Sequence, residues 1–124
     1  MTLLADATTT AVCTIGDLEV ERGRAALVGD RQVALFLLRD GTVHAVSNLD
    51  PYSGAHVISR GIVGTRGDAP TIASPMHKQV FDLRTGECLD TQGKPPHALT
   101  VWRVVLRGEK VHLLPPSDAS AGEC

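Results

Sequence analysis

A series of short apolar runs, each closed by turn-forming residues, limits the folds that this chain can adopt. The clearest run is Gln32–Leu38, which places apolar side chains on both alternating faces and so predicts a strand covered on both sides. Asp40-Gly41 follows, a dipeptide that favours a tight hairpin in which both turn residues take positive φ. Thr42–Ser47 provides the returning strand. We therefore predict an antiparallel hairpin with a buried first strand.

The same pattern continues along the rest of the chain. Further strands are predicted at Thr71–Ala73, Gln79–Leu83, Thr100–Arg107 and Lys110–Leu114, with turns at Arg84–Glu87 and Gly108-Glu109. Gly86 is expected to adopt a left-handed conformation in its turn. Helical periodicity is weak, and only Gly16–Glu21 and Gly54–Ser59 are compatible with a short helical turn. The pattern predicts an all-β sandwich or barrel of short antiparallel strands.

The length of 124 residues accommodates one domain. We expect a flexible N-terminal segment at residues 1–11 and a folded domain at 12–115. Residues 116–124 are expected to form a disordered tail, because they are rich in Ser, Ala, Gly and acidic residues after two prolines.

Composition and charge exclude several classes of partner. The net charge of -2 and the pI of about 6.2 argue against nucleic acid or an anionic membrane surface, which attract basic chains. No apolar stretch approaches the ~20 residues needed to span a bilayer, and we expect no secretory signal. The three cysteines, Cys13, Cys88 and Cys124, are widely spaced and odd in number, as expected for reduced thiols in the cytoplasm.

Catalytic motifs are absent from the sequence. It contains no Gly-x-Ser-x-Gly elbow, no phosphate-binding glycine-rich loop and no His-Glu-x-x-His motif. A Ser-His-Asp set can be written from Ser74, His77 and Asp50, but without a strained nucleophile turn it carries little weight. We therefore predict no catalytic residues and no independent active site in this chain.

Two segments share an ordered frame, Ala45–Ala55 and Ala73–Gly86. The frame resembles the two cluster-binding loops of Rieske ferredoxins, which carry Cys-x-His and Cys-Pro-x-His and bind a 2Fe–2S cluster through two thiolates and two imidazoles. The substituted positions hold Asp50 for the first Cys, Tyr52 for the first His and Ser74 for the second Cys, and His77 alone keeps a ligand identity. The resemblance implies a Rieske-like fold with vestigial cluster positions, and we predict no cofactor or metal bound there.

Other ligand sets receive little support from the spacing. Cys13 and Cys88 are poor substitutes, because the chain has no Cys-x-x-Cys or Cys-x-His spacing. A mononuclear site of Asp50, Tyr52 and His77 is a minor alternative, since sites of His and carboxylate ligands normally use a second imidazole. The simpler interpretation of His77 is a loop residue that bonds to a backbone carbonyl.

The residues that depart from the ferredoxin frame have a resemblance of their own. They resemble the small subunit of cytoplasmic NAD(P)H-dependent nitrite reductase, from about Val12 to Leu114, through the pieces Ser47–Tyr52, Ile58–Gly61, Ala73–Met76, Lys78-Gln79 and Gly86–Cys88. This resemblance implies an accessory subunit for the six-electron reduction of nitrite to ammonium in nitrite assimilation. The partner would be a large subunit that carries FAD, a 4Fe–4S cluster and sirohaem and takes electrons from NADH or NADPH.

The two loops would then present a recognition surface at one end of a rigid sheet. We expect the partner-binding residues to be Pro51, Tyr52, Met76 and Lys78, because Tyr and Met suit the centre of an interface. The residues leave two alternatives open: a Rieske-type 2Fe–2S ferredoxin that serves an oxygenase, and a stand-alone binding module of the same fold.

Overall fold

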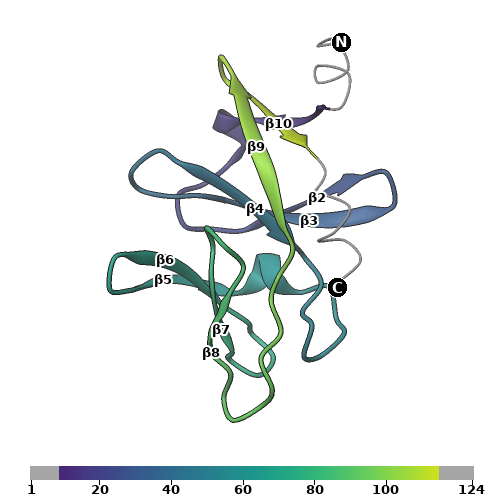
Figure 1. The fold of residues 1–124 in the computed structure, drawn as a ribbon. Coiled ribbons are helices and arrows are strands. Elements are labelled where there is room, and N and C mark those ends of the chain that lie inside the picture. The colour runs from purple at the N-terminus through teal and green to yellow at the C-terminus, as the bar shows by residue number, and fades with distance from the viewer. Residues whose placement is uncertain (1–8, 115–124) are drawn as a thin grey trace, which may run out of the picture.

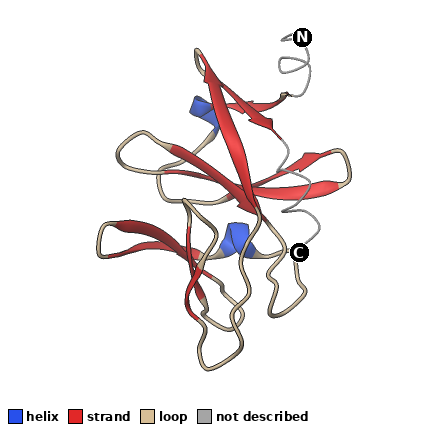
Figure 2. Cartoon of the chain, viewed as in Figure 1, coloured by secondary structure: helices blue, strands red, loops and turns tan. Residues whose placement is uncertain are grey.

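The computed structural model describes residues 9–114 and is built almost entirely from β-strands (Figures 1 and 2). Two short 3-10 helices interrupt them, η1 at Ile15–Asp17 and η2 at Ile58–Arg60. The strands in chain order are β1 Thr10–Thr14, β2 Arg24–Val28, β3 Arg31–Leu37, β4 Val43–Ser47, β5 Ile62–Arg66, β6 Ala69–Ala73, β7 Val80–Asp82, β8 Cys88–Asp90, β9 Val101–Arg107 and β10 Lys110–Leu114. The prediction of an all-β fold is confirmed.

The strands form two antiparallel sheets. The larger has six strands in the order β1-β10-β9-β4-β3-β2, and the smaller has four in the order β5-β6-β7-β8. In Figure 1 the small sheet lies below the β3–β4 hairpin, and the β9–β10 hairpin points to the opposite end. Most connections are short hairpins, so chain neighbours are also sheet neighbours.

Strand β3 separates two apolar cores. Val33, Leu35 and Leu37 pack among strands of the large sheet, together with buried residues such as Trp102. The intervening residues Ala34, Phe36 and Leu38 belong to a second core, which includes Ile58, Ile72, Phe81 and Leu83. Full burial of such side chains contributes about 1.5–3 kcal/mol each relative to exposure. The predicted burial of both faces of this strand is therefore confirmed.

The turn between β3 and β4 differs in one respect from its prediction. The Gly41 N–H donates to the Leu38 carbonyl, and the Leu38 N–H donates to the Thr42 carbonyl. Gly41 has φ of 88°, but Asp40 does not have positive φ. Its carboxylate instead accepts hydrogen bonds from the Thr42 N–H and hydroxyl at 3.0 and 2.6 Å. The hairpin was predicted correctly, whereas positive φ at both turn residues was wrong, because the loop is one residue longer and needs a left-handed residue only at glycine.

The described region can be compared with the domain boundaries expected from the sequence. Strand β1 begins at Thr10, two residues before the domain start expected at residue 12. The tail expected at 116–124 lies outside the described residues. Across residues 9–114, the structure contains no helix of the length and apolar character that a bilayer crossing requires.

Candidate functional site

Three loops meet at one end of the molecule, the lower end in Figure 1. The first covers residues 49–57, between β4 and η2, and the second covers residues 74–79, between β6 and β7. The third covers residues 91–98, between β8 and β9. We call these three segments the tip. The four vestigial positions lie in its first and second loops.

Asp50 organises the first loop from a fully buried position, with 0% of its surface exposed. Its carboxylate accepts a hydrogen bond from the Tyr52 N–H at 2.8 Å, the short-range pattern by which Asp starts a turn. Its backbone N–H donates to Ala55 O, and its carbonyl accepts from the Gly54 N–H, both at 2.8 Å. The side chain at the first cysteine position is therefore a structural part of the loop.

Ser74 organises the second loop in the same way and is 1% exposed. Its hydroxyl accepts from the Met76 N–H at 3.2 Å, and its backbone bonds to Lys78 and Gln79 across the loop. The same hydroxyl donates to the Asp50 carboxylate at 2.5 Å. The two cysteine positions are thus brought together, and they join the loops through a direct hydrogen bond.

Tyr52 connects the first loop to the third. Its hydroxyl donates to the Pro95 carbonyl at 2.8 Å and accepts from the His97 N–H at 2.9 Å, and Cys88 Sγ lies 3.6 Å away. Its ring centroid is 6.1 Å from that of Phe81 and 5.2 Å from that of His97. Desolvation and the hydrogen bond with Cys88 raise the pKa of the Tyr52 hydroxyl above its ordinary value.

His77, the one position that keeps a ligand identity, lies among exposed residues. Pro75, Met76 and Lys78 beside it are also exposed, and Lys78 takes a left-handed φ of 66°. Within residues 9–114, no three His, Cys, Asp or Glu side chains are grouped as a metal site of those ligands would require. Of the mononuclear alternative at Asp50, Tyr52 and His77, the first two side chains are engaged in hydrogen bonds inside the tip.

The residues at the four positions do not fit a 2Fe–2S cluster. Such a centre needs two thiolates and two imidazoles, and these positions supply a carboxylate, a hydroxyl, a phenol and one imidazole. Asp50 and Ser74 are also committed to each other and to backbone amides. The phenol of Tyr52 is committed to the third loop.

Two further polar residues hold the tip together, although in the sequence they stand only as members of longer motifs. Asn48 is 2% exposed; its amide donates to Gln32 Oε1 and His56 O, and its Oδ1 accepts from the Ser59 N–H at 2.7 Å. Gln79 is fully buried, and its side chain donates to Thr91 O at 3.5 Å, which links the second loop to the third. The signal available in the sequence was an amide residue beside an otherwise apolar strand.

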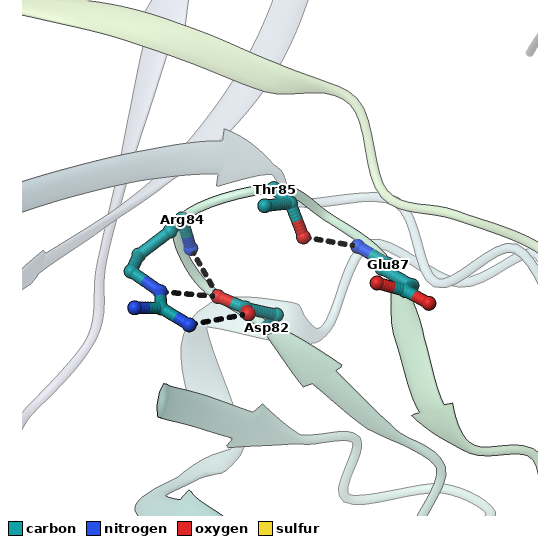
Figure 3. Close-up of polar contacts among 4 residues, drawn as sticks. All are labelled: Asp82, Arg84, Thr85 and Glu87. Atoms are coloured by element: carbon teal, nitrogen blue, oxygen red, sulfur yellow. Dashed lines mark hydrogen bonds and ion pairs between the residues drawn. The ribbon is translucent and has the colours of Figure 1, made fainter. Parts of the chain in front are cut away.

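The turn that follows the second loop is shown in Figure 3. Arg84 Nε and Nη2 lie 3.2 and 3.1 Å from the carboxylate oxygens of Asp82, and this contact lowers the pKa of the carboxyl. Gly86 has φ of 81°, as predicted, and a Cβ there would stand 2.1 Å from Leu99 O. The Leu99 N–H donates to Gly86 O, so the turn fixes the chain where it leaves the third loop.

The chain is similar to known proteins in both sequence and fold. Residues 8–114 match the family described as the Rieske-like 2Fe-2S domain. The nitrite reductase (NADH) small subunit of Escherichia coli K12 is 39% identical over 82 residues, which are 65% of this chain and 76% of that protein. A crystal structure from Mycobacterium tuberculosis, provisionally described as an NADH-dependent nitrite reductase small subunit, is 41% identical with a TM-score of 0.80 and covers 88% of this chain and 96% of its own.

A third relative has a different architecture. The nitrite reductase (NAD(P)H) large subunit of Klebsiella oxytoca is 38% identical over 101 residues, which cover 82% of this chain and 10% of that protein. The chain thus spans about a tenth of this relative and about three quarters of the Escherichia coli one. Family match, identity and fold agree: the chain belongs to the Rieske-like 2Fe-2S domain family and, within it, to the nitrite reductase small subunits.

Proposed function

We propose that this chain is the accessory small subunit of an NAD(P)H-dependent nitrite reductase and supports the six-electron reduction of nitrite to ammonium. The match within the Klebsiella oxytoca large subunit carries this proposal, because a related domain there belongs to the same polypeptide as the large subunit. A domain that is found covalently joined to a protein in one organism is a good candidate to bind that protein when it is a separate chain.

In this proposal the chain carries no redox centre. The support is the commitment of Asp50, Ser74 and Tyr52 to hydrogen bonds inside the tip, together with the lack of thiolates at the cluster positions. FAD, a 4Fe–4S cluster and sirohaem are then the cofactors of the large subunit, where the chemistry occurs in the cytoplasm. The same residues argue against the Rieske-type ferredoxin alternative, because such a carrier depends on its cluster.

The small subunit binds the large one through the tip, with Pro51, Tyr52, Met76 and Lys78 as the contact residues predicted from the sequence. The exposed Met76 and Lys78 support this assignment. Pro51 and Tyr52 are half-buried, and Tyr52 is occupied by internal contacts. The chain's own contribution to the reaction is to bind, stabilise or tune the large subunit.

Co-expression with a large nitrite reductase subunit tests the proposal. We expect the two chains to co-purify, and nitrite-dependent oxidation of NADH or NADPH to rise when this chain is present. A stand-alone binding module of the same fold would behave differently: the chains would separate, and nitrite reduction would be indifferent to this chain. That result would refute the proposal.

A further inference from the structure

The tip contains a third loop that the sequence did not place there, and its position gives the binding surface a definite chemistry. We infer that all three loops form one docking face for an acidic patch on the large subunit, and that Tyr52 is a positioning residue inside this face. The inference rests on the proposed function. It adds the third loop and the charge of the partner surface, and it changes the role of Tyr52.

The three loops are joined to one another in pairs. Ser74 bonds to Asp50 between the second and first loops, and Tyr52 bonds to Pro95 and His97 between the first and third. The third pair, the second and third loops, is joined by the Gln79 side chain, which donates to the Thr91 carbonyl. Because each pair is linked by a side-chain hydrogen bond, the loops behave as one surface. A partner that binds one loop therefore meets all three in a fixed arrangement.

Tyr52 is suited to holding this surface in place. Its hydroxyl already donates to one carbonyl and accepts from one amide of the third loop, and its ring packs against Phe81 and His97. Its polar atom therefore has little capacity left for a partner. The groups that it holds, Pro95 and His97, are exposed.

The charges of the face are of one sign. Residues 49–57, 74–79 and 91–98 are all described, and within them the single carboxylate, Asp50, is buried, whereas Lys78 and Lys94 are exposed. The whole chain has the opposite balance, with 14 acidic and 12 basic residues. A cationic face on a net acidic protein favours an acidic partner surface, because complementary charge speeds association and excludes other orientations.

The face also carries exposed apolar side chains and a groove lined in part by prolines. Met76 and Leu49 are 50% and 40% exposed. A groove of about 510 Å³ lies between the first and third loops, lined by Leu49, Pro51, Pro96 and His97 among others. Prolines restrict the backbone before binding, which lowers the entropy lost on association. The complementary surface therefore combines an apolar projection with carboxylates.

The test is to measure binding of the full-length chain to the large subunit at low and high salt. We expect Lys78→Glu with Lys94→Glu to slow association about tenfold at low salt and to remove most of its salt dependence. Arg103→Glu with Lys110→Glu is the matched control, since it reverses two exposed charges in the β9–β10 hairpin, away from the tip in Figure 1. The control should bind as the wild type does.

Tyr52→Phe tests the positioning role separately, because it removes the hydroxyl and keeps the ring on Phe81. We expect faster hydrogen exchange at the His97 amide and a several-fold rise in Kd. Faster exchange with an unchanged Kd would show that the third loop is not part of the docking face. If the wild type binds and the lysine variant binds equally well, the docking face is wrong; if the wild type forms no complex, the proposed function itself fails.

Discussion

The cysteine positions of the Rieske frame hold Asp50 and Ser74, which are buried and bond to each other. The histidine positions hold Tyr52 and His77, which do not share one environment: the first is half-buried and the second is exposed. Tyr52 is tied to the third loop, and His77 is exposed. The contrast follows burial. A buried polar side chain without a metal must find a partner in the protein, whereas an exposed one is satisfied by water.

Removing the carboxylate of Asp50 should have the largest effect on stability of the substitutions that test this difference between buried and exposed positions. Asp50→Ala leaves the Ser74 hydroxyl and the Tyr52 N–H without their acceptor in a buried site. We expect the free energy of unfolding to fall by about 3 kcal/mol, measured by urea denaturation. Asp30→Ala, at an exposed turn, is the matched control and should stay within about 0.5 kcal/mol of wild type. Equal effects at the two positions would mean that the buried pair does not hold the loops.

The other half of the pair should have the next largest effect. Ser74→Ala removes the donor to Asp50 and the acceptor for the Met76 N–H, and leaves a buried carboxylate with one hydrogen bond fewer. We expect a loss of about 2 kcal/mol by the same measurement. In the double variant with Asp50→Ala the two losses should not add, because both remove the same bond. Additive losses would contradict a direct interaction.

Asp82 extends the comparison to a buried carboxylate outside the tip, one that has a guanidinium partner. Arg84 holds the pKa of Asp82 below its ordinary value of 3.8, so this contribution to stability is present above pH 3.8 and is lost as the pH falls through the folded-state pKa. Arg84→Met should therefore be slightly less stable than wild type at neutral pH, by less than Ser74→Ala. Denaturation curves at several pH values should show the difference shrinking below pH 3.8; a constant difference would assign the effect to lost packing.

His77 should give the smallest effect. Because His77 is exposed, we expect His77→Ala to change the free energy of unfolding by less than about 0.5 kcal/mol, measured by urea denaturation. A loss comparable with that of Ser74→Ala would show that His77 has a structural partner, and the contrast between the two kinds of position would fail.

The sequence predicted those strands and turns that a short stretch of residues determines by itself. The apolar residues on both faces of Gln32–Leu38 predicted β3, and Gly86 was identified from its turn. The strands β2 and β5 were not predicted, because edge strands expose much of their surface: Leu27 and Ile62 are 66% and 74% exposed. Ala26 and Val28 of β2 and Val63 of β5 pack against the cores, but the exposed neighbours Leu27 and Ile62 are apolar too, so the sequence shows no alternation of apolar and polar residues.

In the tip, too, some features were predicted from the sequence and others were not. The frame of the two loops located Asp50, Tyr52, Ser74 and His77, but it did not show what these residues contact. The bond from Tyr52 to Pro95 joins residues 43 apart in the chain, and the bond from Ser74 to Asp50 joins residues 24 apart. Contacts of this kind depend on how two sheets place their loops, and no local pattern records them. Tyr52 was therefore predicted as a contact residue, and we now propose a positioning role.

Whether the tip binds a cluster is decided by the iron and acid-labile sulfide content of the chain, purified without oxygen from cells supplied with iron. A 2Fe–2S ferredoxin purified in parallel controls for loss of the cluster. The hydrogen-bonded pair of Asp50 and Ser74 predicts a colourless protein with neither iron nor sulfide. About two irons and two sulfides per chain would contradict the account, since the cysteine positions would then be holding a cluster without thiolates.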